Sequence, residues 1–177
     1  MPEEGALDQL GRAPADQAEI LRVLVAHEVR FLLVGGIAVR VHGHPRSTLD
    51  VDVLPDPSSD NMRRLAAALS DLDAAAVDDR HRRLELDLSH PESLALGNYF
   101  LTTRAGALDL VNGARPDLLR YRRLEDRAVE VTVGGLSLLV IGLDDLIAMK
   151  REAGREKDLR DIAALTELER LQHGEGG

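Results

Sequence analysis

The sequence predicts an α/β (α+β) fold in which a mixed β-sheet is flanked by helices and followed by a helical C-terminal part. Strand-type and helix-type apolar patterns alternate in the first half of the chain, and two hairpin patterns followed by two helical patterns occupy the second half. In addition, 177 residues with 44% hydrophobic side chains are enough for one domain with a buried core. Aromatic residues make up only 2%, so this core is expected to be aliphatic.

Helices are predicted where apolar residues recur three and four positions apart, often with a polar cap before them or a glycine after them. The predicted helices span residues 16–29, about 37–42, 58–72, 143–152 and 156–171. Strands are predicted from short apolar runs or from alternation of apolar and other residues. The predicted strands span residues 31–34, 49–54, 80–90, 99–103, 107–111, 129–133 and 136–141, and of these 80–90 has the weakest pattern. Glycine-containing turns join the last four into two hairpins.

These elements are expected to form a single domain of residues 16–172, in which residues 143–172 are a C-terminal helical pair. Residues 1–15 contain glycine and proline breakers and are expected to be a flexible N-terminal tail. Residues 173–177 are expected to be a solvated tail at the other end.

Composition limits the classes of function. Acidic residues outnumber basic ones 31 to 22, so the net charge of −9 gives no overall attraction to a phosphate backbone. The chain has no cysteine, which excludes disulfides, thiolate zinc sites and thiol nucleophiles. The first ten residues are acidic and lack the basic and apolar regions of a signal peptide, and no apolar run is long enough for a membrane span. The protein is therefore expected to be cytoplasmic, without a membrane partner.

Asp50 and Asp52 are the most informative pair of side chains. They alternate with Leu49, Val51 and Val53, so the strand pattern predicts that both carboxylates lie on one face. A divalent cation between two such carboxylates would remove their repulsion. A half-exposed strand with a polar face is the other interpretation, and Asp-x-Asp alone favours it. Aspartate is disfavoured in strands, however, which shifts the balance toward a metal site.

Gly35-Gly36 lies between a predicted strand and a predicted helix. Such a turn lets backbone N–H groups approach an anion closely, which suits a triphosphate. A structural Gly-Gly turn would have the same sequence. Its short distance to Asp50 within one strand–helix–loop–strand unit favours the phosphate-binding interpretation.

The segment 31–52, with its glycine pair followed by Asp50-Val-Asp52, resembles the signature of the polymerase-β-like nucleotidyltransferases. Arg46-Ser-Thr48-Leu just ahead of Asp50 is most similar to the AbiEii-type toxin nucleotidyltransferases of toxin–antitoxin systems. The resemblance implies a nucleotidyltransferase fold, magnesium (or manganese) on Asp50 and Asp52, and nucleotide phosphates on the glycine turn. Many relatives have Gly-Ser where this chain has Gly-Gly, which removes a hydroxyl from the phosphate contacts.

The resemblance also implies a third carboxylate on a neighbouring strand. Asp109, between Leu108 and Leu110, is the best match and would ligate metal and accept the proton of the attacking hydroxyl. Asp87, between two leucines as well, is the rival candidate.

Further nucleotide contacts are expected from Arg46, Thr48 and Lys150. Lys150 follows the apolar residues of its helix by one turn, so it leans toward the buried side and needs an anion. The resemblance indicates that this anion is the triphosphate. A lysine that reaches solvent, or an ion pair between Lys150 and Asp158, is the structural alternative.

The function implied is metal-dependent transfer of a nucleoside monophosphate from NTP to an acceptor hydroxyl. The leading acceptor is the 3′ end of tRNA, with the protein as a toxin that is paired with an antitoxin. One alternative is transfer to an aminoglycoside-type or lincosamide-type small molecule, which an acidic surface would suit. The other is a non-catalytic member of the fold that binds a nucleotide or a partner protein.

Overall fold

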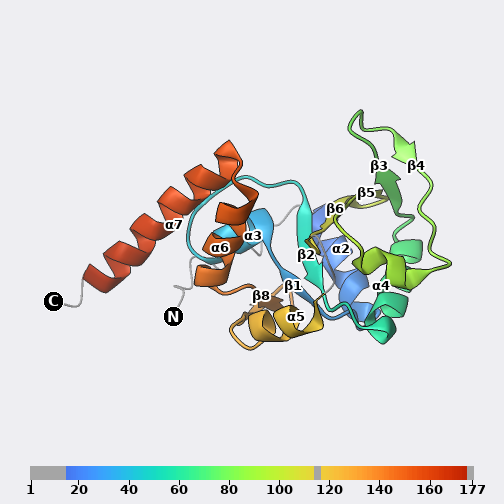
Figure 1. Cartoon of the computed structure of the whole chain (residues 1–177), viewed down its shortest axis with the longest axis horizontal. Helices are drawn as coiled ribbons and strands as arrows, with labels where there is room; N and C mark the ends of the chain where they lie inside the picture. The colour runs from blue at the N-terminus through green and yellow to red at the C-terminus, as the bar shows by residue number, and fades with distance from the viewer. Residues whose placement is uncertain (1–14, 114–116, 175–177) are drawn as a thin grey trace.

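The computed structural model describes residues 15–113 and 117–174, which form an eight-stranded mixed sheet with helices around it (Figure 1). The strand order is β4-β3-β5-β6-β2-β1-β8-β7. The strands are β1 (Phe31–Leu33), β2 (Val51–Pro55), β3 (Ala75–Val77), β4 (Arg83–Leu84), β5 (Tyr99–Thr103), β6 (Gly106–Leu110), β7 (Val129–Val133) and β8 (Leu136–Val140). The helices are α2 (Ala15–Ala26), α3 (Gly35–Val41), α4 (Ser59–Asp71), the 3-10 helix η1 (Pro91–Ala95), α5 (Leu118–Glu125), α6 (Leu143–Ala153) and α7 (Glu156–Gly174). The predicted fold class is confirmed.

The centre of the sheet brings together strands that are far apart in the sequence. β2 is antiparallel to β1 and parallel to β6, and β1 is parallel to β8. The two predicted hairpins, β5–β6 and β7–β8, are therefore separated in the sheet by β2 and β1. This order places the glycine turn after β1 and the acidic residues of β2 and β6 in one region of the sheet.

Strand alternation buries one face of β2 and β6. Val51 and Val53 of β2 are buried, as are Leu108 and Leu110 of β6. They belong to one continuous aliphatic core that includes residues of α2 and α4. Because successive side chains of a strand point to opposite faces, the residues between them, Asp52 and Asp109 among them, point away from this core.

The C-terminal helices α6 and α7 pack against each other, and α6 also contacts α3. Gly154 separates them with a φ of 63° in the left-handed region, which ends α6 at the position expected for a glycine cap. Figure 1 shows α7 leading away from the sheet to the C-terminus. None of the helices in the described part of the chain is long and apolar enough to cross a membrane.

Several sequence predictions need correction. The strand predicted for residues 49–54 begins only at Val51, and Leu49 is 82% exposed instead of sharing the buried face of the valines. In the weak pattern of residues 80–90, only Arg83–Leu84 forms a strand. The sequence did not predict β3, η1 and α5, three elements too short for a clear period.

The predicted chain ends are only partly described. Residues 1–14 and 175–177 lie outside the described residues, so the predicted tails stay predictions there. Residue 15, assigned to the N-terminal tail, begins α2. Residues 173 and 174, assigned to the C-terminal tail, belong to α7.

Candidate functional site

The glycine turn lies directly against Asp52. Gly35 has a φ of +62°, and a Cβ atom at this position would overlap the Asp52 carboxylate. A Cβ at Gly36 would lie 2.6 Å from Oγ1 of Thr48. The backbone N–H of Gly36 donates a hydrogen bond to the Asp52 carboxylate. Side chains at either glycine would therefore displace the residues that the turn brings together.

Asp52 and Asp109 are direct neighbours across the parallel pair β2–β6. Directly opposite residues have Cβ atoms about 5 Å apart and point to the same face. Asp50 lies just before β2 and is exposed, and its charge acts on both of these carboxylates. We call Asp50, Asp52 and Asp109 the acidic site. The rival candidate Asp87 lies in a loop with its side chain 72% exposed, and it is paired with Ser89 and His90.

Two carboxyl groups of the acidic site have raised pKa values. Burial raises the pKa of Asp52, and the negative charge of Asp50 adds to this effect against the hydrogen bond from Gly36. Burial, followed by the charges of Asp52 and Asp50, raises the pKa of Asp109 to about 7. The acidic site therefore concentrates negative charge that its surroundings do not fully compensate.

The donor set of the acidic site fits a divalent cation of the magnesium type, because carboxylate oxygens are the ligands that this ion prefers. Because their pKa values are raised, the ionised forms of Asp52 and Asp109 would be stabilised by a nearby positive charge. In the described part of the chain, no three acidic or histidine side chains form a preformed cation cage. Carboxylates repel one another and favour rotamers that hold them apart. The fit of a divalent cation to the acidic site therefore rests on the type of its donor atoms and on the strand register.

Lys150 is 6% exposed, as its helical position predicted, but its ammonium group faces acids of the protein itself. Nζ lies 2.7 Å from Asp161 and 3.4 Å from Asp158, and Nε of Arg155 lies 2.7 Å from Asp158. Arg46 forms an ion pair with the same Asp161. We call these five residues, Arg46, Lys150, Arg155, Asp158 and Asp161, the ion-pair network. The alternative offered for Lys150, an ion pair with Asp158, is thus present.

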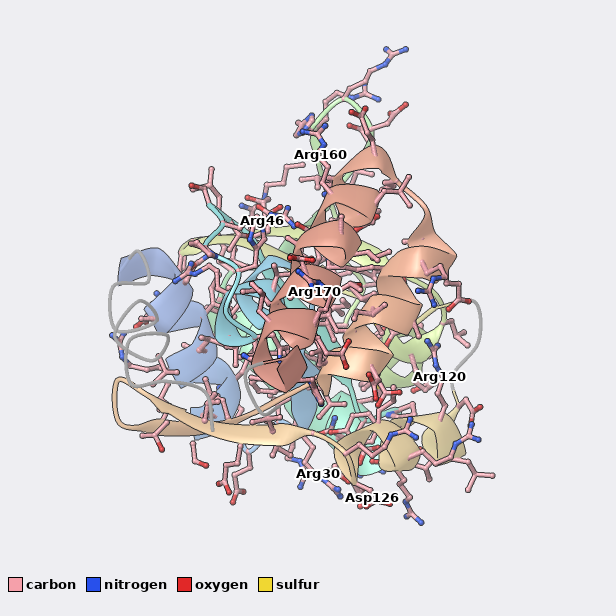
Figure 2. The ribbon with its side chains drawn as sticks, turned by 90° about the vertical axis from the view of Figure 1, so that its left-hand side faces the viewer. Arg30, Arg46, Arg120, Asp126, Arg160 and Arg170 are labelled. Atoms are coloured by element: carbon pink, nitrogen blue, oxygen red, sulfur yellow. The ribbon has the colours of Figure 1, made fainter. Side chains whose placement is uncertain are left out.

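The ion-pair network connects α6 and α7 with the loop that leads into β2. Arg46 lies in this loop, and Figure 2 shows it beside α7, the helix that also carries Arg160. On the opposite side, Nε2 of Gln17 in α2 donates to the backbone carbonyl oxygens of Thr48 and Asp50, at 3.0 and 3.4 Å. The loop that carries the predicted nucleotide contacts is therefore held from both sides.

Three residues near the site were not assigned to it from the sequence. Gln17 and Asp161 hold the loop before β2. Lys157, at the start of α7, lowers the pKa of both Asp52 and Asp109 through its positive charge, and its side chain is exposed. The sequence offered only weak signals for these residues, because each acts across a distance of many positions in the chain.

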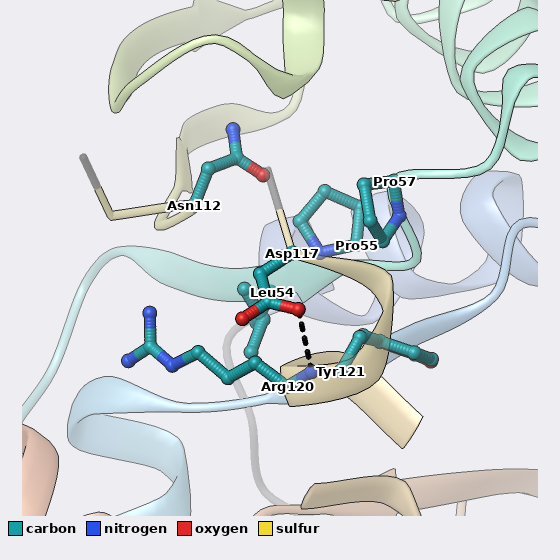
Figure 3. A pocket seen from close by; sticks show the side chains of 7 residues that line it. All are labelled: Leu54, Pro55, Pro57, Asn112, Asp117, Arg120 and Tyr121. Atoms are coloured by element: carbon teal, nitrogen blue, oxygen red, sulfur yellow. Dashed lines mark hydrogen bonds between the residues drawn. The ribbon is translucent and has the colours of Figure 1, made fainter. Parts of the chain in front are cut away.

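A small pocket lies elsewhere, between the end of β2 and the start of α5 (Figure 3). There the Asp117 carboxylate caps α5 by accepting a hydrogen bond from the backbone N–H of Arg120 at 2.9 Å. The pocket is lined by Leu54, Pro55, Pro57, Asn112, Asp117, Arg120 and Tyr121. It contains none of the predicted site residues. We interpret it as a small packing gap beside the first turn of α5.

The glycine corner lies against Asp52, and Asp109 is the neighbour of Asp52 on β6, which is part of the arrangement that the resemblance implied. The family described as "nucleotidyltransferase of unknown function (DUF6036)" matches residues 16–173. The chain belongs to this nucleotidyltransferase family. The predicted enzyme class is thereby confirmed, while the AbiEii-type assignment within it is not. A comparison with curated protein sequences finds no match.

Solved structures of nucleotidyltransferases share the fold of this family member. The lincosamide antibiotic adenylyltransferase LnuA with lincomycin bound is 17% identical, with a TM-score of 0.57 over 86% of this chain and 96% of that chain. ANT(2")-Ia in complex with adenylyl-2"-tobramycin is 14% identical, with a TM-score of 0.52 over 89% and 92%. An antigenic nucleotidyltransferase-like protein from Paracoccidioides brasiliensis is 16% identical, with a TM-score of 0.53 over 91% and 77%. At these identities the similarity shows the fold alone.

Proposed function

We propose that this chain transfers a nucleoside monophosphate from NTP to an acceptor hydroxyl, with pyrophosphate as the leaving group. One observation carries the proposal: Asp52 and Asp109 stand side by side on β2 and β6, with Gly35 in contact with Asp52. Two half-buried carboxylates side by side are costly, and a ligand of opposite charge would relieve that cost.

In the proposed reaction, Asp50, Asp52 and Asp109 hold magnesium, or manganese in its place. The bound ion would neutralise the charge of the triphosphate and lower the barrier to attack by the acceptor. Asp109, the acid directly beside Asp52 across the β2–β6 pair, would accept the proton of the acceptor hydroxyl. Gly35-Gly36 would lie beside the phosphates, because the missing Cβ atoms let Asp52 and Thr48 pack directly against this turn.

Positive charge for the triphosphate comes from the start of α7 and from the loop before β2. Lys157 and Arg155 both act on Asp52 and Asp109 through their charges, and the exposed side chain of Lys157 has the freedom to reach a phosphate. Lys150 acts on Asp52 through its charge while it stays in the ion-pair network. Thr48 lies against Gly36 and Arg46 pairs with Asp161 of α7, which supports a role for this loop at the edge of the proposed phosphate site.

The proposed acceptor is the 3′ end of tRNA, which would make the protein a cytoplasmic toxin with a cognate antitoxin. The Arg46-Ser-Thr48-Leu-Asp50-Val-Asp52 segment supports this acceptor through its resemblance to the AbiEii-type enzymes. A small molecule is the second candidate, and a specific observation favours it. The fold is shared with LnuA, whose structure contains lincomycin, and with ANT(2")-Ia, whose structure contains adenylylated tobramycin.

The test is transfer of label from each of the four NTPs, labelled at the α-phosphate, in the presence of magnesium. Parallel reactions contain total tRNA, lincomycin or tobramycin. Label on tRNA supports the toxin proposal, and label on either drug supports the second candidate. Asp52→Asn should abolish either signal, whereas Asp87→Asn, which removes an exposed acid in a loop, should not.

Some outcomes would contradict the proposal. If no acceptor is labelled and magnesium does not promote NTP binding, the chain is a non-catalytic member of its family. If Asp52→Asn retains full transfer, the acidic site is not where the reaction occurs. A chelator should stop transfer by the unmodified chain, and added magnesium or manganese should restore it.

A further inference from the structure

Phe100 is an exposed aromatic residue in a chain that has few aromatic residues. The sequence contains two Phe, two Tyr and no Trp residues. Phe31 and Tyr121 are buried, and the hydroxyl group of Tyr99 donates to the Ser93 carbonyl oxygen at 2.9 Å. Phe100 in β5 is 56% exposed. Single exposed apolar side chains are common, so the position of Phe100 and not its exposure carries the argument.

Phe100 lies in the same cross-strand row as the acidic site. It is the direct partner of Asp109 in the antiparallel pair β5–β6, and Asp109 is the direct partner of Asp52 in β2–β6. Directly opposite residues point to the same face, with Cβ atoms about 5 Å apart. The ring of Phe100 therefore stands beside the carboxylate of Asp109, on the face of the sheet that points away from the aliphatic core.

The two ends of this cross-strand row differ, because Phe100 is at one end and the glycine turn is at the other. The sheet order is β5-β6-β2-β1, and Gly35 follows β1 and contacts Asp52. In phosphoryl transfer the attacking oxygen and the leaving oxygen lie roughly in line on opposite sides of the phosphorus. If the glycine turn binds the departing pyrophosphate, the acceptor approaches from the side of Asp109 and Phe100.

We infer that Phe100 is an acceptor-binding residue and that the acceptor carries a ring whose face packs against it next to the reacting hydroxyl. This inference rests on the proposed function and adds a feature of the acceptor to it. A phenyl ring has no hydrogen-bonding group, so it selects for flat or apolar surface and not for a polar pattern. The terminal base of an RNA and the ring of a small molecule both present such a face.

The experiment replaces Phe100 and follows the acceptor and the nucleotide separately. Phe100→Ala should raise the KM for the labelled acceptor about 10-fold, the size of the loss when one base–aromatic stack is removed, and leave the KM for NTP unchanged. Phe100→Trp should keep most of the acceptor affinity, whereas Phe100→Leu should not. Leu119→Ala is the matched control, since it removes a 72% exposed apolar side chain from α5.

The absence of tryptophan in the sequence provides a second readout. Phe100→Trp introduces a single indole, and its emission should change on titration with the acceptor that binds there, whether total tRNA, lincomycin or tobramycin. The emission of Leu119→Trp should not change in the same titration. The identity of the ligand that alters the Phe100→Trp signal distinguishes an RNA base from a small-molecule ring.

The possible failures are distinguishable. Transfer that depends on Asp52 but is unchanged by Phe100→Ala overturns the role of Phe100 and leaves the proposed function intact. A Phe100→Ala effect on the KM for NTP, with no effect on the acceptor, also overturns it. Absence of transfer by the unmodified chain overturns the proposed function and this inference with it. Thermal melting of each variant shows that the fold is retained.

Discussion

Two groups of aspartates in this protein differ in how their charge is balanced, and the first group is buried while Asp52 and Asp109 of the second are half-buried. In the ion-pair network, burial alone would raise the pKa of Asp158, but Arg155 and Lys150 outweigh it, so the pKa is lowered. In the acidic site, burial and neighbouring acids raise the pKa of Asp109 to about 7, although Lys157 and Arg155 act in the other direction. The first group has cations in contact, and the second has only cations at a distance.

The difference distinguishes aspartates whose charge stabilises the fold from aspartates whose charge is available to a ligand. Asp158 and Asp161 of α7 receive their cations from α6, from the turn before α7 and from the loop before β2, so they hold these segments together. Asp52 and Asp109 are brought together by strand pairing, which supplies a second negative charge and no positive one. A network satisfied from within is structural, whereas an unsatisfied cluster is a candidate site.

The largest expected effect is on activity. Asp109→Asn should lower kcat for nucleotidyl transfer by about 10²–10⁴-fold, because the amide does not accept the proton of the acceptor hydroxyl. Asp158→Asn changes an acid of the ion-pair network and should leave far more activity. Steady-state kinetics with the labelled acceptor measures both. Equal losses in the two variants would remove the functional distinction between the two groups.

The next effect is on stability. Lys150→Met should lower the free energy of unfolding by about 3 kcal/mol, because it leaves two buried carboxylates with less compensation. Arg160→Met breaks an exposed pair with Glu156 on α7 and should change stability little. Urea unfolding followed by circular dichroism provides the measurement. If Lys150→Met is neutral, the network does not hold the helices.

In the acidic site, removing a charge should raise the free energy of unfolding and not lower it. The pKa of Asp109 is raised from 3.8 to about 7 by folding, so between these values the folded state binds more protons than the unfolded state. Stability of the metal-free protein should therefore fall as pH rises from about 4 to about 7. Asp109→Asn should remove this decline and stabilise the protein by about 2 kcal/mol at pH 8, a figure that allows for screening by water.

Urea unfolding at a series of pH values, with a chelator present, tests this expectation. The informative quantity is the difference between the unmodified chain and Asp109→Asn at each pH, since other groups cancel in it. A difference that does not change between pH 4 and pH 8 would mean that folding does not raise the pKa of Asp109.

The smallest expected effect concerns Lys157. Lys157→Ala should raise the KM for NTP about fivefold, since a solvent-exposed cation contributes about 1 kcal/mol to binding a phosphate. Arg160→Ala removes a cation from the same helix that is already paired with Glu156, and it should not alter this KM. An effect of Arg160→Ala as large as that of Lys157→Ala would point to the general charge of α7.

The sequence predicted elements with a clear local signal and missed those without one. The period of residues 51–54 and the glycine turns of both hairpins are local, and the corresponding strands are present. The prediction for Leu49 was wrong because the alternation in the sequence starts before the strand itself begins at Val51. The position of Lys150 on the buried side was predicted, but its immediate partner Asp161 was not, since only the packing of α6 on α7 brings them together.

The sequence by itself determined the local units of this protein: the glycine corner, the Asp-x-Asp pair and the type of most helices and strands. Tertiary structure alone decided that β6 lies beside β2, and with it that Asp109 and not Asp87 adjoins Asp52. It also decided that Phe100 continues that row. Side-chain periods are set by neighbouring residues, whereas register between distant strands is set by how the whole core packs.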